Sequence, residues 1–369
     1  MIKMTNNDGR WFAVIMAGGQ GTRFWPESTE ERPKQLLDLL GTGKSLLRMS
    51  FERAASIVPP SNILVVTGRM IASMVAKDLP DLPPGNMLVE PFGRNTAPCI
   101  GWAALHVRRR CPEGIMTVLP ADHLVMDEKA FSVVMQLAME RAQSAGTIVT
   151  IGIRPHRAET GYGYVEGGRV VSGPVLEAVR FVEKPDRLTA EHYLQDGNYF
   201  WNAGIFNFSA ERILSDIGRF LPALGQGLDR LGKAMAEAGA AGVPESLLEE
   251  TYSTMQPISI DYGVMEKEDR GAIEVIPATF GWSDLGSWGS IYERLPCDKD
   301  GNVVRGGTLP VLVDAKGCLL STSRPGKVVA VCGVDNLVVI DTDDAVLICP
   351  RGRDQDVRKL TEIMKSHRS

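Results

Sequence analysis

A glycine-rich loop with two cations is the segment of this sequence with the clearest chemical potential. Residues 17–34, AGGQGTRFWPESTEERPK, directly follow a short apolar run that predicts a β-strand. Open α/β sheets bind ligands at the carboxyl ends of their strands, which is where this loop begins. Glycine lets the backbone approach an anion closely, so successive N–H groups can surround phosphate oxygens. Arg23 and Lys34 add cations that could neutralise charge on a phosphoryl group in transfer. The loop therefore indicates a phosphate-binding site.

Two familiar phosphate-binding motifs are not satisfied by this chain. The dinucleotide fingerprint needs a small residue at the position where Phe24 stands, so a dehydrogenase is not expected. The stretch GTGKS at 41–45 ends like a P-loop, but Asp38 occupies the position of its first glycine. We expect that stretch to be a turn that opens the helix containing Phe51.

Two carboxylates are candidates for holding a divalent metal. Asp122 follows the predicted strand 115–119 within LPADH, and Asp284 lies in FGWSDLGSW between flexible glycines. Mg²⁺ is bound in phosphoryl-transfer sites by one or two carboxylates together with substrate phosphates. A single loop aspartate is more often a turn or cap residue, so the two are candidates only in combination with the glycine loop.

Composition and charge exclude several kinds of protein. A chain of 369 residues, 44% hydrophobic and 23% charged, is ordinary for a globular protein of about two domains. Lys and Arg number 40 against 45 Asp and Glu, so polymeric nucleic acid is not an expected partner. No apolar run reaches the roughly 18 residues of a membrane span and the start does not resemble a signal peptide, so we expect no membrane association and a cytoplasmic location. The six cysteines form no C-x-x-C pair, which favours reduced thiols over a zinc or disulfide site.

The elements that must position these residues are typical of an α/β protein. From Trp11 to about Ile153, short apolar runs alternate with helical patterns, as in βαβ units around a mostly parallel sheet. The predicted strands lie at 11–16, 62–67, 86–90, 115–119 and 147–153. A helix is predicted over 128–145, with an apolar stripe of Phe131, Val134, Met135, Ala138, Met139 and Ala142.

The pattern changes twice further along the chain. Less regular strands surround a helical stretch at 209–255; they lie at 177–184, 201–208 and 272–278. After residue 295, short strands follow at close spacing and precede a final helix at 354–366; they lie at 309–314, 317–321, 326–332, 336–341 and 345–349. Such spacing is typical of a small β domain such as a short β-helix. We expect a catalytic domain at 1–290 and a C-terminal β domain at 291–369, whose apolar strands could support a homodimer.

A series of ordered motifs carries a family resemblance. The loop AGGQGTRFWPESTEERPKQLL resembles the signature of nucleotidyltransferases that make nucleotide sugars. Further stretches are similar to mannose-1-phosphate guanylyltransferases, in order from residue 13 to about 357: EPFGRNTAPCIGWAAL, LPADH, ETGYGYVE, FVEKP, FWNAGIFNF, SIDYGVMEK, WSDLGSW and DTDDAVLICPRG. The resemblance implies a Rossmann-like, mostly parallel sheet of the nucleotide-diphospho-sugar transferase type, followed by a small β domain.

The resemblance also implies roles for individual residues. The nucleotide would be bound by Gly18, Gly19, Gly21, Thr22, Arg23, Asn95 and Thr96. The sugar phosphate would be bound by Gly163, Glu183, Lys184 and Asn202. Asp122 and Asp284 would hold Mg²⁺, and Arg23 and Lys34 would contact the leaving pyrophosphate. Asp261 and Glu266, in SIDYGVMEK, also match the family, but no role is assigned to them beyond structural support.

The implied activity is the transfer of GMP from GTP to α-D-mannose 1-phosphate, giving GDP-mannose and pyrophosphate. One alternative is a related enzyme for another sugar 1-phosphate, such as a manno-heptose, or another nucleoside triphosphate. A more remote alternative is a protein that binds a nucleotide sugar without turnover. Longer members of the family carry a further cupin-like isomerase domain, for which this chain has no room, so a single activity is expected.

Overall fold

The computed structural model describes residues 9–19, 21–239 and 242–368, and their contacts divide the chain into two compact units. Unit 1 comprises the residues up to Gly18, together with Ser50–Ala121 and Val125–Trp282. Unit 2 comprises Gly19–Met49, Asp122–Leu124 and the chain from Ser283 onward. The predicted boundary near residue 290 follows chain order, whereas unit 2 collects segments from three parts of the chain.

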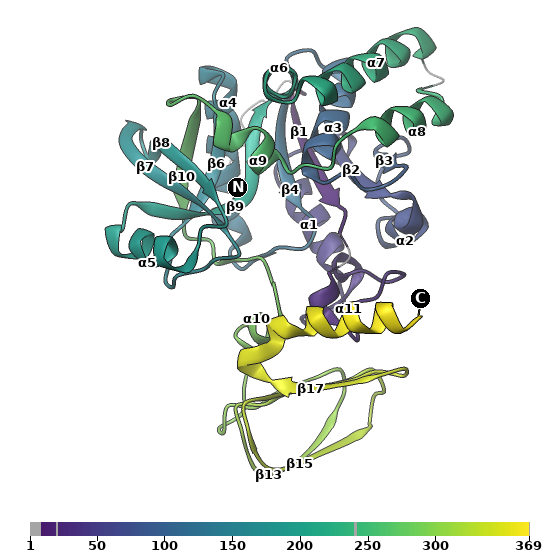
Figure 1. Ribbon diagram of the computed structural model, residues 1–369, viewed down its shortest axis with the longest axis vertical. Helices are drawn as coiled ribbons and strands as arrows, with labels where there is room; N and C mark the ends of the chain where they lie inside the picture. Colours follow the sequence, from purple (N-terminus) through teal and green to yellow (C-terminus); the bar gives the residue numbers. More distant parts are fainter. Residues whose placement is uncertain (1–8, 20, 240–241, 369) are drawn as a thin grey trace. The chain divides into compact units, whose positions relative to one another are not determined.

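Unit 1 is built on a nine-stranded sheet in the order β3-β2-β1-β4-β9-β6-β10-β8-β7. Its strands are β1 (Trp11–Ala17), β2 (Ile63–Gly68), β3 (Met87–Glu90), β4 (Ile115–Pro120), β6 (Ile148–Ile153), β7 (Gly163–Ser172), β8 (Val175–Glu183), β9 (Tyr199–Ser209) and β10 (Ile273–Ala278). In the described part of the chain, only β8 and β9 run opposite to the other strands of this sheet. The predicted mixed α/β fold with a mostly parallel sheet is confirmed (Figure 1). Two short strands, β5 (Leu124–Val125) and β11 (Trp282–Ser283), lie where the chain passes from one unit to the other.

Helices cover both faces of this sheet. They are α2 (Ala72–Asp78), α3 (Thr96–Arg110), α4 (Glu128–Ala145), α5 (Arg187–Asp196), α6 (Ala210–Phe220), α7 (Pro222–Ala238), α8 (Glu245–Thr254) and α9 (Ile260–Gly263). Met116 and Val118 of β4 join a core cluster with side chains of α3, α6 and α7. Between them, Thr117 Oγ1 lies 3.8 Å from Met135 Sδ of α4. Successive strand residues point to opposite faces, so α4 covers the face opposite α3, α6 and α7.

The predicted helix over 128–145 is confirmed at both ends. Asp127 caps α4 by accepting a hydrogen bond from Ala130 N, and Gly146 ends the helix in a left-handed conformation. Of the predicted stripe, all but the half-buried Val134 are buried. Among the described helices, none is long and apolar enough to cross a membrane.

The C-terminal part of unit 2 is a stack of short strands that pair in parallel, except for the last strand, which is antiparallel to its neighbour. They are β12 (Val303–Arg305), β13 (Leu309–Lys316), β14 (Leu319–Thr322), β15 (Val328–Asp335), β16 (Leu337–Asp341) and β17 (Val346–Pro350). β12, β14 and β16 pair in parallel in one sheet, and β13 pairs in parallel with β15 in a second sheet. The chain therefore alternates between two sheets, and the strands β12 to β17 together are called the β stack. The register places Val303, Leu319 and Val338 in one buried column. This is the solenoid arrangement that the close strand spacing predicts.

The glycine loop packs against this β stack inside unit 2. Phe24, Leu37 and Leu39 share one core cluster with residues that follow β11 or belong to the stack: Leu285, Trp288, Ile291, Val303, Leu319, Val338 and Ile340. The rings of Phe24 and Trp288 meet edge to face with centroids 5.2 Å apart. Apolar burial therefore holds the predicted phosphate loop on the C-terminal part of the chain.

An ion pair adds to this attachment. The carboxylate of Glu27 accepts hydrogen bonds from Arg305 Nη1 at 2.8 Å and from Ser321 Oγ at 3.1 Å. The Arg305 and Glu27 side chains are only 9% and 17% exposed, so this pair is shielded from solvent more than a surface pair. The loop is thereby fixed at two strands of the β stack.

Two short helices complete unit 2. α10 (Trp288–Tyr292) precedes the β stack, and α11 (Val357–Arg368) follows it (Figure 1). The final helix begins at Val357 rather than at 354, because Arg351–Asp356 form a separate 3-10 turn. The GTGKS stretch is the predicted turn: Ser45 Oγ accepts from Arg48 N at 2.9 Å where α1 (Leu46–Ala55) begins.

Candidate active site

The glycine loop departs from the sheet directly after β1. Gly18 follows Ala17, and Gly19 and Gly21 adopt positive φ angles of 98° and 56°. A Cβ at Gly21 would collide with Cβ of Lys34, so this close approach of two backbones requires glycine. Gln20 lies outside the described residues. Thr22 and Arg23 form a short 3-10 turn with Phe24, so the loop curls back on itself immediately after the glycines.

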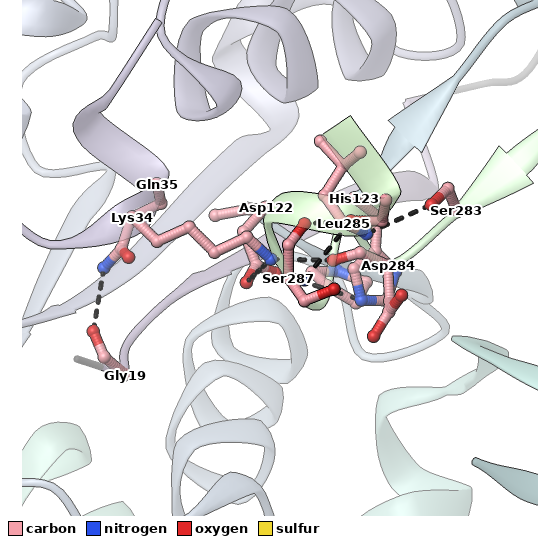
Figure 2. Close-up of polar contacts among 12 residues, drawn as sticks. Gly19, Lys34, Gln35, Asp122, His123, Ser283, Asp284, Leu285 and Ser287 are labelled. Carbon is pink, nitrogen blue, oxygen red and sulfur yellow. Dashed lines mark hydrogen bonds and ion pairs between the residues drawn. The ribbon is translucent and has the colours of Figure 1, made fainter. Parts of the chain in front are cut away.

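Lys34 is the centre of the polar contacts near this loop. Its Nζ lies 2.8 Å from Asp122 Oδ2 and donates at 2.7 Å to the main-chain oxygen of Asp284 (Figure 2). The residue is only 6% exposed. Three candidates from three separate segments of the sequence therefore meet at one ammonium group.

Asp122 is held in its ionised form. Burial by itself would raise the pKa of Asp122, but the charges of Lys34 and His123 and the Lys34 hydrogen bond outweigh it, so the pKa is lowered. His123 Nε2 lies 3.9 Å from Asp122 Oδ1. His123 thus lies against Asp122 and supports the carboxylate electrostatically. An ionised carboxylate is the form that can bind a cation.

Asp284 lies in a constrained turn. Leu285, which follows it, has a φ of 46°, a left-handed conformation that is rare for a residue with a branched side chain. Its N–H donates to Ser283 Oγ at 3.2 Å, which stabilises the turn (Figure 2). A Cβ at Gly286 would lie 2.8 Å from Asp284 Oδ2, so glycine leaves room for the carboxylate. Strain of this kind is found where a structure holds a functional group in a fixed place.

A cavity of about 580 Å³ joins these groups within unit 2. It is lined by Gly21, Thr22, Arg23, Phe24, Lys34, Asp122, His123, Asp284, Gly286, Arg358, Thr361 and Glu362. Its size falls in the range of small-ligand sites. Arg23, Lys34, Asp122 and Asp284, the predicted catalytic set, all face it. Arg358, Thr361 and Glu362, from α11, were not predicted to take part.

The donor groups suit a metal that a substrate helps to hold. No cluster of three or more His, Cys, Asp or Glu side chains is found among the residues that the structure describes. Asp122 and Asp284 both line the cavity, and the Lys34 ammonium contacts the carboxylate of Asp122 and the main-chain oxygen of Asp284. Mg²⁺ in nucleotide sites takes one or two carboxylates and completes its shell with phosphate oxygens and water. Asp122 and Asp284 fit that requirement.

The predicted sugar-phosphate residues meet in unit 1. Gly163 of β7 pairs with Glu183 of β8, and a Cβ at Gly163 would collide with Glu183 Oε2 and lie 3.3 Å from Asn202 Cβ. Lys184 Nζ lies 2.8 Å from Glu183 Oε1. Burial, the largest influence on Lys184, would lower its pKa, but the contacts with Glu183 outweigh it and the pKa is raised. The four residues form one cluster of a cation, a carboxylate and an amide.

Asp261, for which the family resemblance implies no role beyond structural support, belongs to the same cluster. Asn202 Nδ2 donates to Asp261 Oδ1 at 3.0 Å, while Asn202 Oδ1 accepts from Thr150 Oγ1 and Gly204 N, each at 3.1 Å. These contacts fix which way the Asn202 amide points. Burial, aided by the charge of Glu183, raises the pKa of Asp261 to about 7.

Glu266 supports the cluster from the same stretch of sequence. Its Oε1 accepts a hydrogen bond from the main-chain N of Glu183 at 2.7 Å. The motif SIDYGVMEK thus contributes two carboxylates to this cluster. In the sequence, only the family resemblance of that motif pointed to Asp261 and Glu266. No local pattern indicated that they would contact Asn202 and Glu183.

Asn95 and Thr96, the predicted base-binding residues, lie at the start of α3. Asn95 Oδ1 accepts from Thr96 N at 2.8 Å with the Asn95 backbone at a φ of 68°. Thr96 Oγ1 accepts from Ile260 N at 2.8 Å. Since Ile260 immediately precedes Asp261, Thr96 fixes the start of α9 and, through it, the position of Asp261. Contact of either residue with a base stays a prediction.

Comparison with known proteins gives two family matches. The nucleotidyl transferase family matches residues 12–300, and the MannoseP isomerase/GMP-like beta-helix domain matches residues 309–363. The second match agrees with the stacked parallel strands described above.

Relatives match along almost the whole chain. The xanthan biosynthesis protein XanB of Xanthomonas campestris pv. campestris (strain B100) is 39% identical over 356 residues, which are 96% of this chain and 73% of that protein. A mannose-1-phosphate guanylyltransferase of Klebsiella pneumoniae is 37% identical over 359 residues, with 96% and 74% covered. A crystal structure described as mannose-1-phosphate geranyltransferase from Thermus thermophilus superposes with a TM-score of 0.85 at 36% identity and covers 96% of this chain and 99% of that one.

Proposed function

We propose the function of this chain from the family to which it belongs: the nucleotidyl transferases and, among them, the mannose-1-phosphate guanylyltransferases. It transfers GMP from GTP to α-D-mannose 1-phosphate and gives GDP-mannose and pyrophosphate. The observation that carries the proposal is the meeting of Lys34, Asp122 and Asp284 beside the glycine loop. These are the charged groups that a triphosphate and its metal require.

We propose that the nucleotide phosphates occupy the cavity of unit 2. The N–H groups of Gly18, Gly19, Gly21 and Thr22 would face the phosphate oxygens, and Arg23 and Lys34 would contact the pyrophosphate that leaves. Lys34 would then exchange part of its contact with Asp122 for a phosphate oxygen. Asn95 and Thr96 would lie at the base, with guanine recognised through hydrogen bonds.

Mg²⁺ is the cation we propose for Asp122 and Asp284. When bound, it would neutralise charge on the phosphates as the bond to the pyrophosphate breaks. The lowered pKa of Asp122 supports this assignment, because the carboxylate stays ionised at neutral pH. The fixed turn at Leu285 supports it as well, because it holds the Asp284 carboxylate in place.

The mannose 1-phosphate would be bound by the cluster of unit 1. Lys184 supplies a cation for its phosphate, and Glu183 and Asn202 supply an acceptor and a donor for sugar hydroxyls. The Asn202 amide is held in one orientation by Thr150, Gly204 and Asp261, so its donor is preorganised. Such preorganisation favours one arrangement of hydroxyl groups over another.

The reaction needs no general base. An oxygen of the sugar phosphate is already anionic, so it attacks the α-phosphorus of GTP directly and forms a new P–O bond. The bond from the α-phosphorus to the bridging oxygen breaks, and that oxygen leaves with its electron pair on pyrophosphate. The protein's task is to align the two phosphates and disperse charge, which agrees with a cavity lined by cations and carboxylates.

A substrate panel tests this proposal. Pyrophosphate release is measured for the wild type with four nucleoside triphosphates, each combined with mannose 1-phosphate, glucose 1-phosphate and a manno-heptose 1-phosphate. We expect the highest kcat/KM for GTP with mannose 1-phosphate. Preference for another base or sugar would reassign the substrate within the family, and nucleotide-sugar binding without any release would contradict an enzymatic role.

A further inference from the structure

The C-terminal helix α11 presents three side chains to the cavity of unit 2. Arg358, Thr361 and Glu362 line it together with the loop residues from Gly21 to Phe24 and with Lys34. They are spaced at i, i+3 and i+4, so they share one face of the helix. A helix that follows the β stack in the chain is therefore part of the same cavity wall as the phosphate loop.

The start of α11 is anchored, so this placement is fixed by packing. Val357, the first residue of α11, is 1% exposed and belongs to the core cluster that contains Phe24 and Trp288. Asp354, in the turn before it, accepts a hydrogen bond from Gly289 N at 2.5 Å. Arg358 follows Val357 directly and is held at the cavity by these contacts.

A phosphate group could replace Glu362 as the partner of Arg358. Its Nε lies 2.9 Å from Glu362 Oε1, and the two side chains are 64% and 60% exposed. Exposed ion pairs within a helix contribute little stability, so replacing Glu362 by another anion costs little free energy. A guanidinium has five N–H donors in a planar fork that matches phosphate oxygens, and a bond to Glu362 through Nε leaves the others for a ligand.

We propose that Arg358 binds the β- and γ-phosphates of GTP, the part that leaves as pyrophosphate, and that Glu362 holds the guanidinium when no nucleotide is bound. The inference rests on the proposed function and adds a third cation to Arg23 and Lys34. Lys34 already neutralises Asp122, so the cavity has fewer cations available than a triphosphate has charges. Arg358 supplies the missing charge from a segment that follows the β stack.

Arg358→Ala, compared with Lys359→Ala, is the test. Lys359 carries the same charge on the next position of α11, is 73% exposed, pairs with Asp356 at 2.7 Å and does not line the cavity. We expect Arg358→Ala to raise KM for GTP, and KM for pyrophosphate in the reverse reaction, about tenfold, as loss of a charge-assisted hydrogen bond would. KM for mannose 1-phosphate should stay unchanged, and Lys359→Ala should resemble the wild type.

Glu362→Gln should have the opposite effect on KM for GTP. Removing that carboxylate frees Arg358 and removes a negative charge from the cavity, so KM for GTP should fall severalfold. If Arg358→Ala and Lys359→Ala have the same constants, or if Glu362→Gln weakens GTP binding, the inference is wrong. An equal rise in all Michaelis constants, with a lowered melting temperature, would show that Arg358 only stabilises the fold and would also overturn it.

Calorimetry separates this inference from the proposed function. GTP and pyrophosphate are titrated into the wild type, Arg358→Ala and Lys359→Ala without any sugar phosphate. Weaker binding of both ligands by Arg358→Ala alone supports the inference even if the sugar assignment fails. A wild type that binds neither GTP nor pyrophosphate would overturn both.

Discussion

The Nζ of Lys34 lies 2.8 Å from the carboxylate of Asp122, although 88 residues separate them in the sequence. One residue ends the glycine-rich segment and the other follows the strand β4. Lys34 also binds the main-chain oxygen of Asp284, so it connects the two proposed metal ligands. Its ammonium therefore contacts both of these segments, which makes Lys34 the first residue to test.

Lys34→Met should abolish most of the activity and leave the fold intact. The methionine fills the space of the lysine stem, but the charge that neutralises the leaving pyrophosphate is lost. Removal of one such group typically lowers kcat by about 10²- to 10³-fold. Steady-state kinetics with GTP and mannose 1-phosphate measure this, and circular dichroism checks the fold. A variant with near-normal kcat would show that Lys34 only neutralises Asp122.

Asp284→Asn should raise the Mg²⁺ concentration that the enzyme needs. The substitution keeps the shape of the side chain and removes the charge that would bind the cation. The readout is the Mg²⁺ concentration at half-maximal activity, measured at saturating GTP. Asp269→Asn is the matched control, because that carboxylate is 72% exposed and pairs with Arg219. Identical Mg²⁺ dependence in the two variants would contradict the assignment of Asp284.

Gly21→Ala should destabilise the protein and displace Lys34. The φ of 56° disfavours any side chain, and the added Cβ would collide with Cβ of Lys34. We expect a loss of about 2 kcal/mol in the free energy of unfolding and a fall in kcat. Gly43→Ala is the control: its φ is 79°, but a Cβ there meets nothing within 4 Å. It should cost about 1 kcal/mol and keep full activity. Equal activity in the two variants would remove the link between Gly21 and Lys34.

The spacing of apolar residues was sufficient to predict helices and strands that bury one face and expose the other. The prediction of a helix over 128–145 matches α4, because its apolar side chains repeat at helical spacing. The helix α3 is not predicted, because it is buried on nearly all sides and its early Pro98 and Gly101 hide the pattern. β12 is missed because three residues are too few to show an alternation.

Contacts between distant segments could not be predicted from pattern alone. The resemblance named Lys34, Asp122 and Asp284 separately, but only the fold shows one ammonium between the other two. The packing of Phe24 on Trp288 likewise depends on a core that joins residues far apart in sequence. Arg358 had no local signal, since an arginine paired at i+4 on a helix is usually a solvated surface residue.

The carboxyl of Asp261 predicts a distinct pH dependence of stability. Its pKa is raised from 3.8 to about 7, chiefly by burial and then by Glu183. Between these two pH values the folded state holds a proton that the unfolded chain has lost, so the free energy of unfolding must fall as pH rises toward about 7 and level off above it. Asp261→Asn cannot titrate and should lose this part of the slope, which is at most about 4 kcal/mol.

Denaturant unfolding of the wild type and of Asp261→Asn, at intervals from about pH 4 to about pH 8, measures this difference. Burial also raises the pKa of Glu90 and Glu268 to about 7, but both remain in the variant, so the difference between the two curves isolates Asp261. Relative to the wild type, the variant should gain stability as pH rises, and parallel curves would contradict the assignment. Asp261→Ala, which removes the acceptor of the Asn202 Nδ2 hydrogen bond, should raise KM for mannose 1-phosphate more than KM for GTP. Equal effects on both Michaelis constants would place Asp261 in general support of the fold.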